Sequence, residues 1–307
     1  MTDLLSQVSA GRLEHDLFYL SRDPLPFRTA AYTRPGASMS SLAEADAFIA
    51  AELERAGYRV SCPRYRVQAF RCDTTKPVHH WYATPDPTDP SYDVANVEAT
   101  LEGRELRDEI IQLVAHKDSM SWIDSPGAHD NAVGTVANLE LARVLAGSGL
   151  RRTLRFLFCN EEHTPWTSRF AAEAAAARGD RIVAVLNVDS LDGKPDAEMA
   201  AGRMTHVVAW STPEGRPLAE LVASGARRHG IDIDVRVVFK EHVNDDDGMF
   251  INAGFRRTVM NVGSWPYGDS EYHLPGDVPE RVSIENLRRS TQLLLAAVLS
   301  IDAGGLG

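Results

Sequence analysis

The sequence predicts an α/β protein, a three-layer α/β/α sandwich around a mixed, largely parallel central sheet. Strand-type and helix-type segments alternate along the chain, as they do in a sheet whose two faces are covered by helices. Two strand segments, residues 109–115 and 181–189, are almost continuously apolar, which is typical of strands buried on both faces. The 307 residues, 44% of them hydrophobic, can bury a full core, and no internal repeat or composition break divides them. We therefore expect one domain over residues 1–307.

The first third of the chain predicts two helices and two strand regions. These are helices at residues 3–20 and 41–56, and strands at residues 58–70 and 91–101. Pro24 and Pro26 follow the first helix, and proline cannot continue a helix. Ser41 and Glu44 have capping-box spacing at the start of the second helix, and Gly57 stops it.

Strands and helices then alternate to the end of the chain. The expected strands are residues 109–115, 153–158, 181–189, 205–210, 231–239 and 255–262. The expected helices are residues 131–145, 167–178, 217–229 and 282–301. Apolar residues recur at helical intervals in the first of these helices, which ends near Gly147 and Gly149.

Composition excludes several classes of protein. A net charge of −11 argues against a nucleic-acid-binding surface. No apolar run approaches the roughly 18 residues that span a bilayer, and the first residues lack a secretory leader. Cys62, Cys72 and Cys159 lack CxxC spacing, so neither a disulfide framework nor a thiolate zinc site is supported. We expect a cytoplasmic protein without nucleic-acid or membrane partners, and homo-oligomer formation stays open.

Side chains that can bind metals follow the ends of the predicted strands. His116 follows strand 109–115, Glu162 follows strand 153–158, and Asp189 ends strand 181–189. Asp130 stands at the start of helix 131–145. The carboxyl ends of parallel strands meet at one edge of a sheet, so these side chains can converge in one crevice.

The candidate metal ligands are His116, Asp130, Glu162, Asp189 and His273. Imidazole nitrogen and carboxylate oxygen suit Zn²⁺. Five ligands exceed what one tetrahedral zinc with a water needs, but they suit two zinc ions that share a bridging carboxylate. Asp130 is the natural bridge, so the sequence predicts two zinc ions per chain.

Neighbouring residues can serve these ligands. Glu161 precedes a ligand, and a carboxylate there can act as general base. Asp118 follows His116 closely enough to orient its imidazole. His79 and His80 are expected to be loop residues, because adjacent side chains in a strand point to opposite faces.

Five motifs follow one another between residues 115 and 277. They are Ala115-His-Lys-Asp118, Gly127-Ala-His-Asp-Asn-Ala-Val-Gly134, Phe156-Leu-Phe-Cys-Asn-Glu-Glu162, Asn187-Val-Asp189 and Tyr272-His-Leu-Pro-Gly-Asp277. In this order they resemble the motifs of the co-catalytic dizinc aminopeptidases, and the resemblance extends from about residue 28 to the end.

The resemblance implies a single zinc peptidase catalytic domain that hydrolyses peptide bonds at a free amino terminus. By motif, Asp130 bridges the metals, Glu161 is the general base and Tyr272 helps to stabilise the oxyanion. It leaves open how Glu162 and Asp189 divide between the two metals.

Four further residues follow from the motifs and their departures. Asp277, in the last motif, is expected to hold the metal ligands in position without binding a metal itself. His129 stands where the family commonly has Asp or Asn, and we expect it to support the ligands rather than to form a polar wall. Asp246 and Asp247 belong to an acidic loop similar to one in the family, and this loop either lines the site or forms a solvated turn. If the two acids face the site, we expect them to contact the substrate's ammonium group.

Other functions stay open at this point. A glutaminyl cyclase shares the fold and part of the ligand set but uses one zinc; Asn131 and the complete ligand set favour hydrolysis instead. A receptor-like relative would have lost ligands, and here all are present. An amidohydrolase or carboxypeptidase acting on small N-acyl compounds stays open as well, because a fold does not set the specificity pocket. The expected partner is a peptide or aminoacyl compound with a free α-amine.

Overall fold

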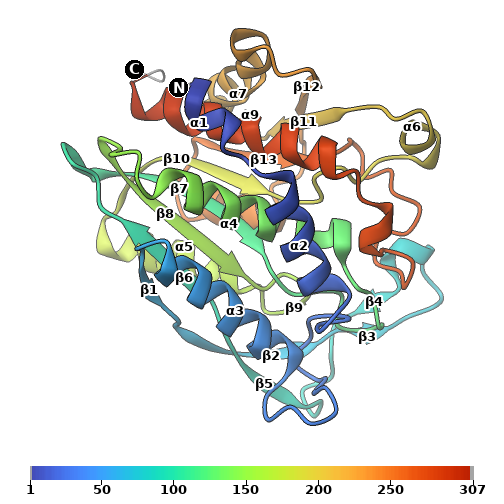
Figure 1. The fold of residues 1–307 in the computed structure, drawn as a ribbon. Helices are drawn as coiled ribbons and strands as arrows, with labels where there is room; N and C mark the ends of the chain where they lie inside the picture. The colour runs from blue at the N-terminus through green and yellow to red at the C-terminus, as the bar shows by residue number, and fades with distance from the viewer. Residues whose placement is uncertain (1, 305–307) are drawn as a thin grey trace.

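A mixed eight-stranded sheet forms the centre of the protein in the computed structural model, which describes residues 2–304 (Figure 1). Across the sheet the strands are β1 (Arg59–Ser61), β6 (Val97–Leu101), β8 (Arg152–Cys159), β7 (Leu106–His116), β10 (Arg181–Val188), β13 (Thr258–Val262), β11 (Thr205–Trp210) and β12 (Asp234–Phe239). The four central strands β8, β7, β10 and β13 run parallel to one another. The pairs β1–β6, β6–β8 and β13–β11 are antiparallel. This arrangement confirms the predicted fold class.

Two small sheets lie beside the large one. Their strands are β2 (Arg64–Ala69), β5 (Ser91–Ala95) and β9 (His163–Thr164) in one, and β3 (Arg71–Cys72) and β4 (Tyr82–Ala83) in the other. A short 3₁₀ helix, η1 (Val78–His80), connects β3 and β4. It contains His79 and His80, which were expected in a loop.

Helices cover both faces of the large sheet. One face carries α3 (Ser41–Arg55), α4 (Val133–Leu145), α7 (Gly215–His229) and α9 (Ile284–Asp302), with α2 (Ala10–Ser21) packed on α4 and α9. The other face carries α5 (Thr167–Arg178) and α8 (Asp245–Asn252). The shorter helices are α1 (Thr2–Ser6), α6 (Asp196–Ala200), η2 (Ala128–Ala132) and η3 (Pro279–Arg281).

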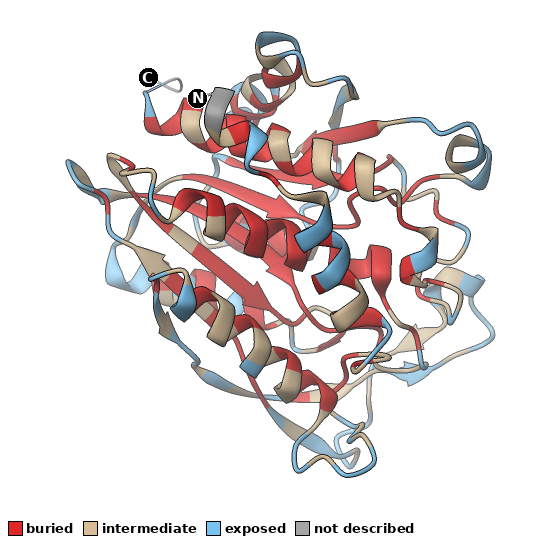
Figure 2. Cartoon of the chain, viewed as in Figure 1, coloured by how far each residue is buried: buried red, intermediate tan, exposed pale blue. Residues whose placement is uncertain are grey.

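The alternation of side chains along the strands separates the two faces. In β8, Phe156 and Phe158 join the core that contains α4 and α9, whereas Leu157 and Cys159 pack against α5 and α8. The larger core extends in sequence from Leu5 to Ile301. Figure 2 shows the central strands and α4 as almost wholly buried.

Most predicted elements are present, but several are divided. Helix 3–20 is two helices, because Ser9 caps α2 and its backbone N–H donates to the buried Glu140 carboxylate at 2.6 Å. Strand regions 58–70 and 91–101 each form two strands that belong to different sheets. The cap of α3 is Ser40 rather than Ser41. No helix within residues 2–304 is long and apolar enough to cross a membrane.

Candidate active site

The predicted ligands converge at the carboxyl ends of the parallel strands. His116 is the last residue of β7, Asp189 directly follows β10, and Glu162 lies three residues beyond β8. Asp130 comes from η2, where its φ of −122° and ψ of 88° depart from helical values. This kink lets Asp130 reach the crevice although α4 follows immediately.

The side chains form two groups that share Asp130. His116 Nε2 lies 3.1 Å from Asp130 Oδ1 and 3.4 Å from Asp189 Oδ1. His273 Nε2 lies 3.0 Å from Asp130 Oδ2 and 3.2 Å from Glu162 Oε1. Each oxygen of Asp130 therefore faces a different histidine. The alternative that the motifs left open is thus decided geometrically, with Asp189 on the His116 side and Glu162 on the His273 side.

Both histidines present the nitrogen that a metal would need. Nδ1 of His116 contacts the Asp118 carbonyl at 3.2 Å, and Nδ1 of His273 contacts the His79 carbonyl at 3.0 Å. A carbonyl only accepts, so it favours the tautomer with the proton on Nδ1 and the lone pair on Nε2. Within residues 2–304, His273 Nε2 and Asp130 Oδ2 are buried without a hydrogen-bond partner. A divalent cation fits this donor set.

The charges of the cluster point the same way. Burial lowers the pKa of His273, but Glu162 and Asp130 outweigh it and raise that pKa to about 10. Burial also raises the pKa of Glu162, to about 7. The pKa of Asp130 is lowered despite burial, because two histidines face it. Without a cation, the cluster would thus need protonated imidazoles to compensate its carboxylates.

Glu161 lies beside His116 and Asp189, and one ligand atom of each of the three lies within 4.8 Å of the others. Its Oε2 atom is enclosed and, among the described residues, has no hydrogen-bond partner. Burial raises the pKa of Glu161 well above its usual value, and the nearby carboxylates of Asp246 and Asp245 raise it further. An enclosed carboxyl with a strong affinity for protons can serve as a general base.

Asp118 connects the two halves of the site. Its Oδ1 accepts from the Glu161 backbone N–H at 2.9 Å and lies 3.4 Å from His116 Nδ1. Its Oδ2 accepts from the Glu162 backbone N–H at 2.9 Å and faces His163 Nδ1 at 2.7 Å. Asp118 therefore contacts a predicted ligand histidine and the Glu161–Glu162 backbone at the same time.

Asp277 positions the backbone of the shared ligand. Its two carboxylate oxygens accept from the N–H groups of His129, at 2.8 Å, and Asp130, at 3.0 Å. Gly127 has a φ of 58°, and a Cβ there would lie 2.4 Å from the Asp130 carbonyl oxygen. This position therefore requires glycine.

His129 lies in a buried ionic cluster behind the ligands. Its Nδ1 is 2.8 Å from Asp269 Oδ2 and 3.3 Å from Asp277 Oδ1, and its Nε2 is 3.5 Å from Asp192 Oδ2. Burial lowers the pKa of His129, but these carboxylates outweigh it and raise the pKa well above its usual value. Lys194 pairs with Asp192, and Arg281 pairs with Asp269 at 2.8 Å. Cations therefore face two of the three carboxylates in this cluster.

Among the described residues, Tyr82, Tyr267 and Tyr272 adjoin the ligands, and the sequence motifs identified only Tyr272; the Tyr82 ring lies edge-on to His273 with centroids 5.8 Å apart. Tyr272 stacks on His273 with ring centroids 3.7 Å apart, and its ring also stacks on Tyr267 at 5.0 Å. The Tyr267 hydroxyl donates to Asp189 Oδ2 at 3.0 Å. Tyr267 lies outside the recognised motifs, so only its position in the segment before His273 could have indicated it.

The expectation for Asp246 and Asp247 is wrong. Asp247 is 2% exposed and its Oδ1 lies 2.7 Å from Lys240 Nζ. Asp246 is fully buried and accepts from Cys159 Sγ at 3.0 Å. Neither lines the pocket next to the ligands, whereas Asp245 does. The helical turn that begins α8 directs the second and third acids of this loop inward.

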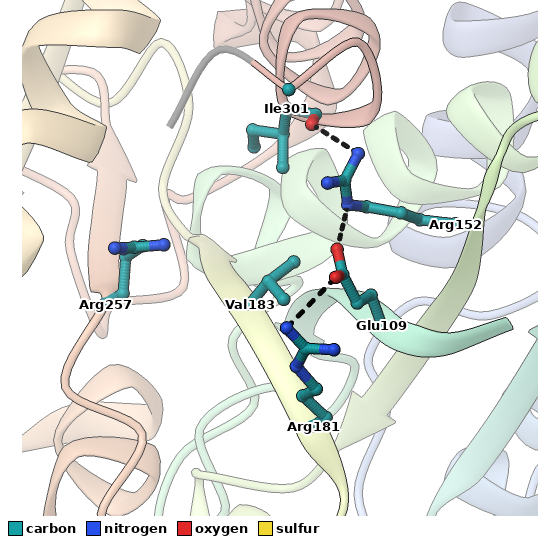
Figure 3. A pocket seen from close by; sticks show the side chains of 7 residues that line it. Glu109, Arg152, Arg181, Val183, Arg257 and Ile301 are labelled. Carbon is teal, nitrogen blue, oxygen red and sulfur yellow. Dashed lines mark hydrogen bonds and ion pairs between the residues drawn. The ribbon is translucent and has the colours of Figure 1, made fainter. Parts of the chain in front are cut away.

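A second pocket lies at the opposite end of the sheet (Figure 3). Arg152 and Arg181 are the first residues of β8 and β10, and both pair with Glu109, at 2.6 and 3.2 Å. Arg152 also donates to the Ile301 carbonyl at 3.1 Å. These contacts connect the first residues of β8 and β10 to α9. They lie at the opposite ends of the strands from the predicted metal ligands.

A parallel sheet that carries a histidine–carboxylate cluster and an unpaired carboxyl at its carboxyl edge has the architecture of a metal-dependent hydrolase. The chain belongs to peptidase family M28, whose model matches residues 96–298.

Individual relatives are distant. Aminopeptidase YwaD of Bacillus subtilis is 25% identical over 201 residues, which cover 62% of this chain and 40% of that protein. The chain spans less than half the length of the first curated relatives that it matches. An aminopeptidase structure from Aneurinibacillus sp. strain AM-1 has a TM-score of 0.73 at 14% identity and covers 97% of this chain and 95% of that one. A Bacteroides thetaiotaomicron glutaminyl cyclase bound to N-acetylhistamine has a TM-score of 0.69 at 15% identity, with coverage of 94% and 97%. At these identities, the two structures show the fold alone.

Proposed function

We propose that this chain is a dizinc aminopeptidase that hydrolyses the first peptide bond of substrates with a free amino terminus. The observation that carries the proposal is the position of Asp130, whose two oxygens face His116 and His273 separately. One carboxylate between two histidines, each with its own second carboxylate, suits a pair of metals that share a bridge. Membership of a peptidase family and the names of the relatives support the same reaction.

In this proposal His116 and Asp189 hold one zinc, Glu162 and His273 hold the other, and Asp130 belongs to both. When bound, the metals would polarise the scissile carbonyl and lower the pKa of water.

Glu161 accepts a proton from the attacking water while the water oxygen bonds to the carbonyl carbon. It then passes that proton to the leaving amine as the carbon–nitrogen bond breaks. Its enclosed carboxyl and its raised pKa suit both transfers. Tyr272 donates its hydroxyl to the oxygen that becomes negative, and the stacking of its ring on His273 supports this role. Asp118 keeps Glu161 in place through the backbone.

The substrate's α-ammonium is recognised by carboxylates near Glu161. A blocked amine would lose a charged hydrogen bond, which changes catalytic efficiency by about ten- to a hundredfold.

Two measurements on the full chain test the proposal. The first is zinc per chain by mass spectrometry, with a value of two expected. The second compares leucyl-4-nitroanilide with its N-acetyl counterpart, and the free amine should be cleaved faster. Faster hydrolysis of the N-acyl compound would indicate an amidohydrolase. One zinc per chain at saturation, with release of ammonia from glutaminyl peptides, would indicate the cyclase.

We also propose that residues 1–307 act as one catalytic domain in the cytoplasm. The main core, which runs from Leu5 to Ile301, supports the first point. Three free cysteines, of which Cys62 and Cys72 are exposed, support a reducing compartment.

A further inference from the structure

A pocket with aromatic walls adjoins the ligand cluster. Its volume is about 440 Å³. Aromatic side chains from four segments line it, namely Tyr82, Phe239, Trp265, Tyr267 and Tyr272. Tyr267 hydrogen-bonds to the ligand Asp189 and Tyr272 stacks on the ligand His273, so the pocket opens beside the reacting bond. A side chain next to that bond would enter it.

The polar wall of this pocket is acidic. Glu241 and Asp245 line it together with one cation, Lys240. Lys240 is 1% exposed, and its Nζ contacts Asp245 Oδ2 at 2.9 Å, Asp247 Oδ1 at 2.7 Å and the Asn244 carbonyl at 2.9 Å. An ammonium has three protons to donate, and all three have acceptors here. Lys240 therefore cannot bind a substrate anion.

The wall keeps an excess of negative charge. The carboxylates of Asp245, Asp247 and Glu241 stand against the single ammonium of Lys240. Glu241 is exposed and has no ion-pair partner among residues 2–304, and the Asp245 side chain remains 18% exposed. Carboxylates in a pocket that is also lined by aromatic rings suit a cationic side chain, since ring faces also attract cations.

We propose that this pocket binds the basic side chain of an amino-terminal arginine or lysine, and that Asp245 and Glu241 determine the preference. The proposal rests on the proposed aminopeptidase function, because it assigns the residue that precedes the cleaved bond. An apolar side chain would also bury its surface against the rings, but it would leave the two carboxylates without a partner.

The test compares two substrates that differ mainly in charge, with an apolar third substrate to report aminopeptidase activity. Zinc-loaded protein is assayed for kcat/KM at pH 8 with arginyl-, citrullyl- and leucyl-4-nitroanilide. Citrulline has the shape of arginine without its charge, so this pair of substrates isolates the effect of the charge. We expect arginyl to exceed citrullyl by about ten- to a hundredfold, the range for a hydrogen bond to a charged group.

Variants locate the effect in the pocket. Asp245→Asn and Glu241→Gln should each lower the arginyl-to-citrullyl ratio by at least about threefold. Asp245→Asn also removes a partner of Lys240, so Glu241→Gln, on an exposed side chain, is the variant that leaves the fold untouched. Asp234→Asn is the matched control, because this exposed acid begins β12 and does not line the pocket. Its ratio should equal that of the wild type.

The outcomes separate the two proposals. In one outcome the leucyl substrate is hydrolysed, but kcat/KM for the citrullyl substrate equals or exceeds kcat/KM for the arginyl substrate. This result would overturn the proposal that the pocket binds a basic side chain, and it would leave the aminopeptidase proposal in place. The basic-residue pocket is also overturned if arginyl is preferred but neither pocket variant changes the ratio. If no free aminoacyl anilide is cleaved by the metal-loaded protein, the aminopeptidase proposal fails and this one fails with it.

Discussion

The exchange of Glu161 for Gln should abolish catalysis while leaving both metals and the fold in place. Its backbone N–H is held by Asp118, and its enclosed Oε2 has no hydrogen-bond partner among residues 2–304. The amide therefore breaks no bond, and it relieves repulsion from Asp245 and Asp246. The free energy of unfolding should change by no more than about 0.5 kcal/mol. Loss of a general base costs about 10²–10⁴-fold in kcat, or roughly 3–5 kcal/mol of activation free energy.

The neighbouring exchange, Glu162→Gln, is the matched comparison. Its Oε1 lies 3.2 Å from His273 Nε2, where a metal would bind. The amide removes a charged ligand, so zinc per chain should fall and added zinc should restore part of the activity. Added zinc should not restore the activity of Glu161→Gln. The assay is kcat on leucyl-4-nitroanilide beside zinc analysis at several zinc concentrations. Near-normal turnover in metal-loaded Glu161→Gln would show that another residue is the base.

Three further predictions follow from the same geometry. Asp130→Ala should lower the occupancy of both metals in zinc analysis, and a variant that retains one full equivalent would contradict the shared ligand. Gly127→Ala should lower the free energy of unfolding by about 1–3 kcal/mol and reduce zinc retention. The reason is that the new Cβ would lie 2.4 Å from the Asp130 carbonyl oxygen. Gly147→Ala is the control, because a Cβ at that position meets nothing within 4 Å. Burial lowers the pKa of His206 to about 4, so the native imidazole stays neutral while the unfolded one gains a proton below its ordinary pKa. The free energy of unfolding therefore falls as the pH falls from about 6.5 to about 4. Between about pH 6.5 and 4.5, the free energy of unfolding of His206→Gln should fall by about 2 kcal/mol less than that of the wild type. Urea unfolding at several pH values measures this, and parallel curves for the two proteins would disprove it.

The sequence predicted elements best where local signals were unopposed. Helix α5 and strand β11 have the predicted bounds, because an alanine-rich segment and a short segment with four consecutive apolar residues allow few alternatives. The divided elements needed information from elsewhere in the chain. The break before α2 depends on Glu140, which is distant in sequence and accepts the Ser9 N–H. Likewise, residues 58–70 divide because their two halves pair with strands of different sheets.

The site shows the same division. The sequence by itself determined which residue types carry the chemistry and that they follow strand ends, because residue order and strand periodicity are local properties. The tertiary structure decided that Asp189 faces His116 while Glu162 faces His273. It also decided that Asp247 forms a buried ion pair with Lys240, whereas Asp245 lines the pocket. Such pairings depend on distances between segments far apart in the chain, and these distances exist only once the strands have packed.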